Sequence, residues 1–164
     1  MTPEYLIARE ALAFRIVSLG YRSVILLSHA ELQEGQVGYS VDPQGRALTG
    51  DKPGDWRESW LVIGYEDQCG DPIFIDVVAP KFPVYTAPQG MGDWLPELVA
   101  TSFANFVRAL TLIKNLSVGR ETPVERQANP ISNNEGRTIL EAISSENPGA
   151  PLEFWETWLN DARQ

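Results

Sequence analysis

The chain has 164 residues, of which 43% are hydrophobic and 21% charged. This composition is typical of one globular domain and excludes a disordered chain. Thirteen basic and twenty-two acidic side chains give a formal net charge of −9, which disfavours nucleic-acid binding because phosphate contacts need clustered Lys and Arg. The acidity suits a basic partner, but it also serves simply to keep a protein soluble.

No signal for a membrane or an oxidising compartment stands out in the sequence. Apolar runs stay shorter than a membrane span, and no basic segment followed by an apolar one opens the chain. The single Cys69 cannot form an internal disulfide. We therefore expect a cytoplasmic protein that does not bind membranes.

The first part of the chain is predicted to hold a helix, a strand and a second, short helix. Apolar residues recur at helical spacing over Pro3–Ser18, which predicts an amphipathic helix that stops near Gly20. Ser23–Leu27 is a continuous apolar run typical of a buried strand. Ser28 is a suitable N-cap for a short helix over His29–Glu34.

A turn-rich stretch follows. Val37–Val41 is predicted as a strand, Asp42–Gly45 as a turn with Pro at its second position, and Arg46–Leu48 as the second arm of a hairpin. Gly50–Asp55 and Pro88–Asp93 are loops by composition.

Between these two loops the sequence indicates a β-meander. Trp60–Ile63, Ile73–Ile75 and Pro83–Thr86 are short runs rich in β-branched and aromatic residues, and turn-forming residues separate them. Gly64 is predicted to mark a bend or a close approach of a neighbouring strand. A meander is a scaffold and contains no catalytic motif.

The second half is predicted to be mainly helical. A wide apolar stripe over Leu95–Leu116 predicts the longest helix, with Phe103 and Phe106 pointing into the core. Arg120–Pro130 is a polar connection.

Two helices should close the chain. One covers Glu135–Ser145, with Asn133 or Asn134 as its N-cap, and the other covers Leu152–Asp161. We expect an α+β fold in which helices pack against a mostly antiparallel, twisted sheet. The whole chain should form a single domain, with 131–164 as a helical C-terminal extension.

The meander also resembles a known family. Similar residues in a similar order are characteristic of the SUKH superfamily, in the branch named after the yeast regulator of cell-wall synthesis. The matching segments are Trp60–Gly64, Gly70–Asp76, Pro83–Tyr85, Gly90–Gly92 and Ser102–Phe103. The resemblance is strongest over 56–110. The N-terminal third departs from the family pattern, because it has no Asn-Gly-Gly turn.

This resemblance implies a function. Bacterial members of the superfamily are mostly small α+β domains regarded as immunity proteins, which bind and block a polymorphic toxin. We therefore expect a non-enzymatic domain without cofactor or metal, whose partner is a protein such as a basic toxin domain. Aromatic side chains dominate interface hot spots. The surface candidates are the loop Gly50–Asp55 with Glu66, Asp67, Asp71, Trp94, Trp155 and Trp158.

Two functions from other classes compete with this interpretation. The carboxylates of Asp71 and Asp76, with His29 as the single histidine, would suit a small hydrolase if folding brought them together. The spacing instead favours turn-forming aspartates and a surface histidine. A self-associating structural protein would use Trp155 and Trp158 as its contact face. The alternative is that the helix carrying them docks on its own domain. The oligomeric state stays open.

Overall fold

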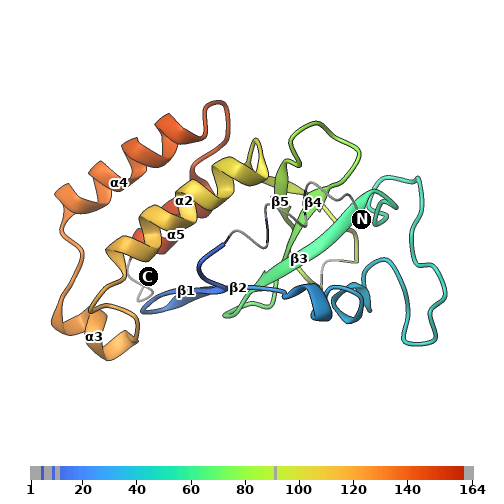
Figure 1. The fold of residues 1–164 in the computed structure, drawn as a ribbon, viewed down its shortest axis with the longest axis horizontal. Helices are drawn as coiled ribbons and strands as arrows, with labels where there is room; N and C mark the ends of the chain where they lie inside the picture. The colour runs from blue at the N-terminus through green and yellow to red at the C-terminus, as the bar shows by residue number, and fades with distance from the viewer. Residues whose placement is uncertain (1–4, 6–8, 10–11, 91, 161–164) are drawn as a thin grey trace.

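The computed structural model describes Tyr5, Arg9 and residues 12–90 and 92–160, which form an α+β fold around one antiparallel sheet (Figure 1). Six strands of these residues pair in chain order, each antiparallel to its neighbour. They are β1 (Ile16–Leu19), β2 (Arg22–Leu26), β3 (Trp60–Glu66), β4 (Pro72–Asp76), β5 (Val84–Thr86) and β6 (Glu97–Ala100). This sheet confirms the predicted fold class, and β2 to β5 confirm the buried strand and the meander.

Helices cover one side of the sheet. The helical elements are η1 (His29–Glu31), η2 (Glu34–Gln36), α2 (Phe103–Leu116), α3 (Pro123–Ala128), α4 (Asn133–Glu146) and α5 (Glu153–Leu159). In Figure 1, α2, α4 and α5 lie together at the upper left, above β1, and the teal chain that follows η2 lies to the right of β3. None of these helices combines the length and the apolar character that crossing a bilayer requires.

The two faces of the sheet differ in burial. Strand side chains alternate between the faces, and α2 contacts both β1 and β6. On the helix-covered face, seven apolar side chains are at most 1% exposed: Val17, Leu19, Val24, Leu26, Ile73, Ile75 and Val84. On the other face, their chain neighbours Ile16, Ser18 and Ile25 stay partly exposed. The main core therefore lies between the sheet and the helices.

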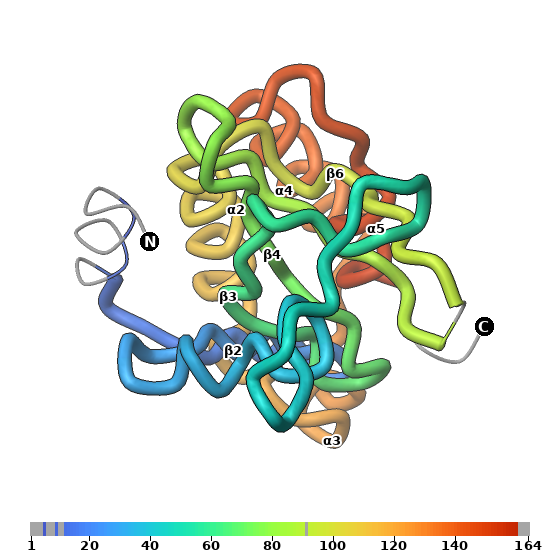
Figure 2. Tube along the Cα trace, turned by 90° about the vertical axis from the view of Figure 1, so that its right-hand side faces the viewer, coloured from blue at the N-terminus to red at the C-terminus, as the bar shows by residue number. Residues whose placement is uncertain are grey.

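A long loop, residues 37–58, covers part of the other face. Figure 2 shows this teal segment in front of β3 and β4, on the side away from the helices. Its Trp56 is 1% exposed and packs on Trp60 and Phe74, with ring centroids 5.3 Å and 4.7 Å away. The Trp56 indole N–H donates to the Trp60 carbonyl oxygen at 3.2 Å. Trp56 therefore anchors the loop to the sheet and adds a second, aromatic layer to the core.

A side chain completes the sheet where β2 ends. The register of β3 shifts between Val62 and Gly64, and β2 pairs with β3 only as far as Leu26. The amide group of Gln36 takes the place of the missing strand: its nitrogen donates to the Val62 carbonyl oxygen and its oxygen accepts from the Val62 N–H, both at 2.9 Å. Gln36 thus satisfies backbone groups that a bulge leaves without a strand partner.

Arg126 joins α3, the β1–β2 hairpin and the end of α5. Its side chain is buried, and its guanidinium donates to the carbonyl oxygens of Leu19, Trp158 and Leu159 at 2.9–3.0 Å. The last carbonyls of a helix have no partner within the helix. Arg126 therefore caps α5 and holds it against the sheet.

The other end of α5 is fixed to β6. The buried Asn147 donates to the Val99 carbonyl oxygen at 3.0 Å and accepts the Thr101 N–H at 2.9 Å. The Trp155 indole N–H donates to the same Val99 oxygen at 3.1 Å. These bonds occupy the outer edge of β6, so this edge is not open to a further strand.

The helix predicted over Leu95–Leu116 is correct only from Phe103 onward. The first part forms β6 instead, paired with β5. Ser102 is in an extended conformation and its hydroxyl accepts the Asn105 N–H at 3.0 Å, which is the geometry of an N-cap. The apolar stripe did not reveal this start, because strand pairing is a long-range interaction. Phe106 is fully buried, as predicted.

The first predicted helix, Pro3–Ser18, lies largely outside the described residues. Tyr5 and Arg9 are helical, but the predicted end is wrong, because Ile16–Leu19 forms β1. The alternation of exposed and buried side chains along β1 has a period of two and not of a helix. Gly20 therefore stands in a hairpin turn at φ +73° and does not stop a helix.

The strand predicted at Val37–Val41 is also wrong. Only isolated bridges link Val41 to Val37 and to Ala47. The turn at Asp42–Gly45 is confirmed by a hydrogen bond from the Gly45 N–H to the Asp42 carbonyl oxygen at 2.9 Å. Residues near this turn lie on the outside of the domain without a continuous partner strand, so local β-propensity does not produce a strand.

The connection predicted at Arg120–Pro130 contains α3. Thr122 and Glu125 form a capping box, in which each side chain accepts a hydrogen bond from the backbone N–H of the other. Pro123 occupies the first turn. Thr-Pro-x-Glu is a helix-start signal that the polar character of the segment concealed.

The N-cap of α4 is Ser132 and not Asn133 or Asn134. Ser132 and Glu135 form a second capping box, with hydrogen bonds of 3.2 Å and 2.9 Å. The Ser132 N–H, followed by the Arg120 guanidinium, lowers the pKa of the Glu135 carboxyl group. The capping box of Ser132 and Glu135 is favoured because it satisfies two backbone donors, whereas an Asn N-cap satisfies one.

A substitution at Gly64 tests the packing of β3 on β2. A Cβ atom at this position would lie 2.5 Å from the carbonyl oxygen of Ile25. Gly64→Ala should therefore lower the free energy of unfolding by about 1–3 kcal/mol, because the backbone must move. Gly136→Ala is the control: its nearest neighbour would be 4.0 Å away, and the helix should gain about 0.5–1 kcal/mol. Denaturant unfolding showing equal effects would contradict the close approach.

A substitution at Arg126 tests the cap on α5. Arg126→Met keeps most of the volume but removes the guanidinium donors from the Trp158 and Leu159 carbonyl oxygens at the end of α5, so stability should fall by about 3–5 kcal/mol. Arg137 is exposed, and its guanidinium donates to the side-chain oxygen of Asn134. Arg137→Met should change stability by less than about 0.5 kcal/mol. A loss below about 1 kcal/mol in Arg126→Met would show that α5 does not depend on this cap.

Candidate functional site

Glu66, one of the predicted surface residues, is a buried structural residue. Its side chain is 3% exposed. Its carboxylate accepts the backbone N–H groups of Gln68 and Cys69 at 3.1 Å and 2.8 Å, and it lies 3.9 Å from the Arg22 guanidinium. These bonds shape the turn between β3 and β4. Glu66 is therefore removed from the candidate surface, and Asp67 and Asp71 of the same turn remain.

The Cys69 thiol in this turn is not activated. Desolvation, followed by the nearby Glu66 and Asp71 carboxylates, raises the pKa of Cys69. A nucleophilic cysteine needs a lowered pKa and a basic neighbour. The environment of Cys69 therefore favours the protonated, less reactive form.

Asp71 links the β3–β4 turn to the loop after β5. Its carboxylate accepts the Gln89 N–H at 2.9 Å. The Gln89 side chain in turn donates to the Tyr39 hydroxyl at 2.6 Å. Three segments that are far apart in the sequence are thus joined by two hydrogen bonds.

An aromatic group lies next to the Asp71–Gln89–Tyr39 hydrogen bonds. The Tyr39 ring lies 5.1 Å from Trp56 and 5.3 Å from Trp94, measured between ring centroids. The Trp94 N–H donates to the Gly54 carbonyl oxygen at 2.8 Å, so the predicted loop Gly50–Asp55 and Trp94 are neighbours. Tyr39 and Trp94 are both half-buried.

We call this region the loop surface; it consists of Tyr39, Gly50–Asp55, Asp67–Asp71 and Pro88–Trp94, of which Met91 lies outside the described residues. These segments carry five aspartates and one lysine, a formal net charge of −4, against −9 for the whole chain. Nearly half of the net charge is therefore concentrated around the Tyr39–Trp94 pair. Sequence reasoning found the loops but missed Tyr39 and Gln89, because only the tertiary contacts bring them to the aspartates.

The two tryptophans of α5 are not part of any surface. Trp155 and Trp158 are both 0% exposed, and Trp155 packs on Phe106 of α2 at 6.0 Å. The proposal that they form a partner-binding face is therefore wrong, and so is self-association through this face. Their alternative, docking of the helix on its own domain, is what the structure shows.

The groups of the alternative hydrolase do not converge. Asp71 precedes β4 and Asp76 ends it, so about 17 Å of extended chain separates the two residues. His29 is exposed at the start of η1. In the described part of the chain, no three His, Cys, Asp or Glu side chains are placed so that they could hold a metal ion. Asp71 is instead committed to Gln89, as a turn-forming aspartate is.

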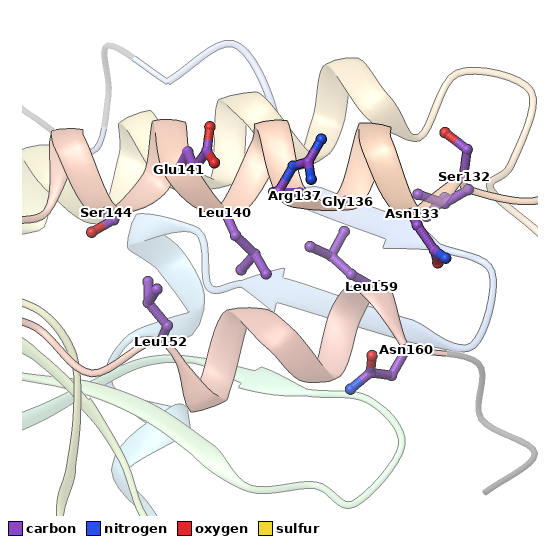
Figure 3. Close-up of a pocket in the computed structure, with 11 residues that line it drawn as sticks. Ser132, Asn133, Gly136, Arg137, Leu140, Glu141, Ser144, Leu152, Leu159 and Asn160 are labelled. Atoms are coloured by element: carbon purple, nitrogen blue, oxygen red, sulfur yellow. The ribbon is translucent and has the colours of Figure 1, made fainter.

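A groove between α4 and α5 has a volume of about 540 Å³. Figure 3 shows Leu140 of α4 and Leu152 and Leu159 at α5 pointing into it, with Arg137 and Glu141 along its upper edge. Its rim carries one acidic and one basic side chain. It therefore has no preferred charge, and none of the predicted site residues lies in it.

Comparison with known proteins adds no relative. No family model, curated protein or solved structure matches this chain significantly.

The ionisation of Tyr39 tests the geometry of the loop surface. Partial burial raises its pKa above the ordinary value, the Gln89 hydrogen bond opposes this, and the Asp71 carboxylate adds to it. Asp71→Asn should therefore lower the pKa of Tyr39, and Gln89→Leu should raise it. Phenolate absorbance, assigned with Tyr39→Phe, measures both. Asp67→Asn is the control. Shifts in the same direction in both variants would contradict the arrangement.

Proposed function

We propose that this chain is a non-enzymatic, protein-binding domain of the immunity type, which neutralises a basic toxin by covering its active groove. The observation that carries the proposal is the half-buried Tyr39–Trp94 pair on a loop surface whose segments carry five aspartates and one lysine. The SUKH-like residues support it, because they build the strands and the Pro88–Trp94 loop on which this pair stands.

The chemistry of the loop surface fits a basic protein. Toxins that cleave nucleic acid need clustered Lys and Arg to hold a polyanion. A surface with a net charge of −4 would attract such a groove and speed the encounter. Aromatic side chains that are already packed lose little conformational freedom on binding, so Tyr39 and Trp94 are suited to be anchors.

Hydrogen bonds hold this surface in place before binding. Gln89 is bonded to both Asp71 and Tyr39, and Asp55 accepts the Lys52 N–H at 3.0 Å. The loops are therefore ordered by internal contacts, which reduces the entropy that a partner must remove. Such a surface can block a groove without any chemical step.

Association kinetics with a candidate basic toxin domain would test the proposal. Trp94→Ala should weaken binding by more than about 30-fold, since it removes a central aromatic anchor. Asp51→Lys should mainly slow association, because the Asp51 side chain is fully exposed in one of the loops. Rising salt should slow association of the native chain as well, since exposed charges are screened over about 8–10 Å.

Controls separate a local effect from a general one. Glu141→Lys makes the same change of charge on α4, where the residue is exposed on the helical side, and should leave association nearly unchanged. Equal slowing by Glu141→Lys and Asp51→Lys would show that only the overall charge matters. Full affinity in Trp94→Ala would remove the loop surface as the binding site.

A further inference from the structure

A second groove lies along the first two turns of α2. It has a volume of about 450 Å³. Its walls are apolar, and they are formed by Leu12, Phe82, Phe103, Ala104 and Val107. It lies on the helical layer, whereas the loop surface covers the opposite face of the sheet.

The chain before β5 holds this groove open. Lys81 and Phe82 both adopt left-handed backbone conformations, with φ of 65° and 55°. The Phe103 N–H donates to the Lys81 carbonyl oxygen at 3.0 Å, which fixes this turn to the start of α2. Tyr5 packs edge-on against Phe82 and Phe103, with ring centroids 6.4 Å and 5.1 Å away. The walls are therefore supported from behind, and the groove is a built feature of the fold.

The charge of this groove is opposite to that of the chain. Its charged lining residues are Lys81 and Arg108, both basic. The helix α2 has two basic residues and no acidic one, although the chain carries a net charge of −9. Arg108 meets one carboxylate, that of Glu146, across an exposed distance of 3.7 Å. Exposed pairs of this kind are weak, so Arg108 can exchange partners at little cost.

We propose that this groove binds a short amphipathic helix of a protein partner, with two apolar side chains in the groove and Asp or Glu beside Lys81 and Arg108. Val107 and Arg108 lie three and four residues after Ala104, on the less buried side of α2, and residues at these spacings form the ridges that a second helix packs against. Helix-in-groove recognition uses apolar anchors at the same spacing. This site is independent of the loop surface, so one domain could hold two partners.

Fluorescence anisotropy with two labelled peptides would test this proposal. One is a helical peptide with leucines at i and i+4 and glutamates beside them; the other has lysines in place of the glutamates. The glutamate peptide should bind and the lysine peptide should not. Arg108→Glu should weaken binding by at least about tenfold, since a facing charge is reversed.

The chain offers matched controls. Lys114→Glu reverses the other basic residue of α2, which also meets one exposed carboxylate, that of Glu121 at 3.8 Å, but lies outside the groove; it should change binding less than about twofold. Ala104→Trp should fill the groove and abolish binding, whereas Thr111→Trp, at another exposed position of α2, should not. Thermal unfolding confirms that each variant is folded.

Several outcomes would overturn the proposal. These are equal binding of both peptides, equal effects of Arg108→Glu and Lys114→Glu, or binding of laurate in place of the peptide, which would indicate a fatty-acid site. A dimer of the native chain that Ala104→Trp dissociates would assign the groove to self-association. Trp94→Ala should leave peptide binding unchanged, so failure here is distinguishable from failure of the proposed toxin binding.

Discussion

The buried guanidinium of Arg126 is the contact on which the arrangement of the layers depends. A helix end presents carbonyl oxygens that water would otherwise satisfy, and those of Trp158 and Leu159 at the end of α5 face Arg126. Arg126 supplies donors to those oxygens and to Leu19 of the first hairpin at the same time. Burying such a charge is costly unless its hydrogen bonds are made. The first hairpin, α3 and α5 are therefore held together by one side chain.

The packing that Arg126 fixes determines which surfaces remain accessible. The helices cover one face of the sheet, and Trp155 and Trp158 are buried in that packing. The other face receives only a long loop, anchored by Trp56, so aromatic rings there stay half-buried. The molecule consequently presents an acidic aromatic surface on the loop side and a basic apolar groove beside α2. Two surfaces of opposite charge on opposite layers would suit partners of opposite charge.

Local signals in the sequence were reliable where the element needs no distant partner. The meander, the turn at Asp42–Gly45 and the body of α2 were all predictable, because alternation, turn residues and a helical apolar stripe act over a few residues. Elements that depend on distant pairing were not. Glu97–Ala100 has a sequence that could continue a helix, and only its pairing with β5 makes it a strand. The edge strand Ile16–Leu19 was missed for the same reason.

By itself, the sequence determined the fold class, most of the strands and the acidic character of the loops. It also indicated that Trp94 and the Gly50–Asp55 loop belong to a surface. Only the tertiary structure decided that Glu66 is buried in a turn and that Gln89 bonds Asp71 to Tyr39. Burial and side-chain contacts between distant segments are properties of packing, and packing follows from the positions of all layers together. A local sequence pattern therefore does not predict the burial of Glu66 or the contacts of Gln89.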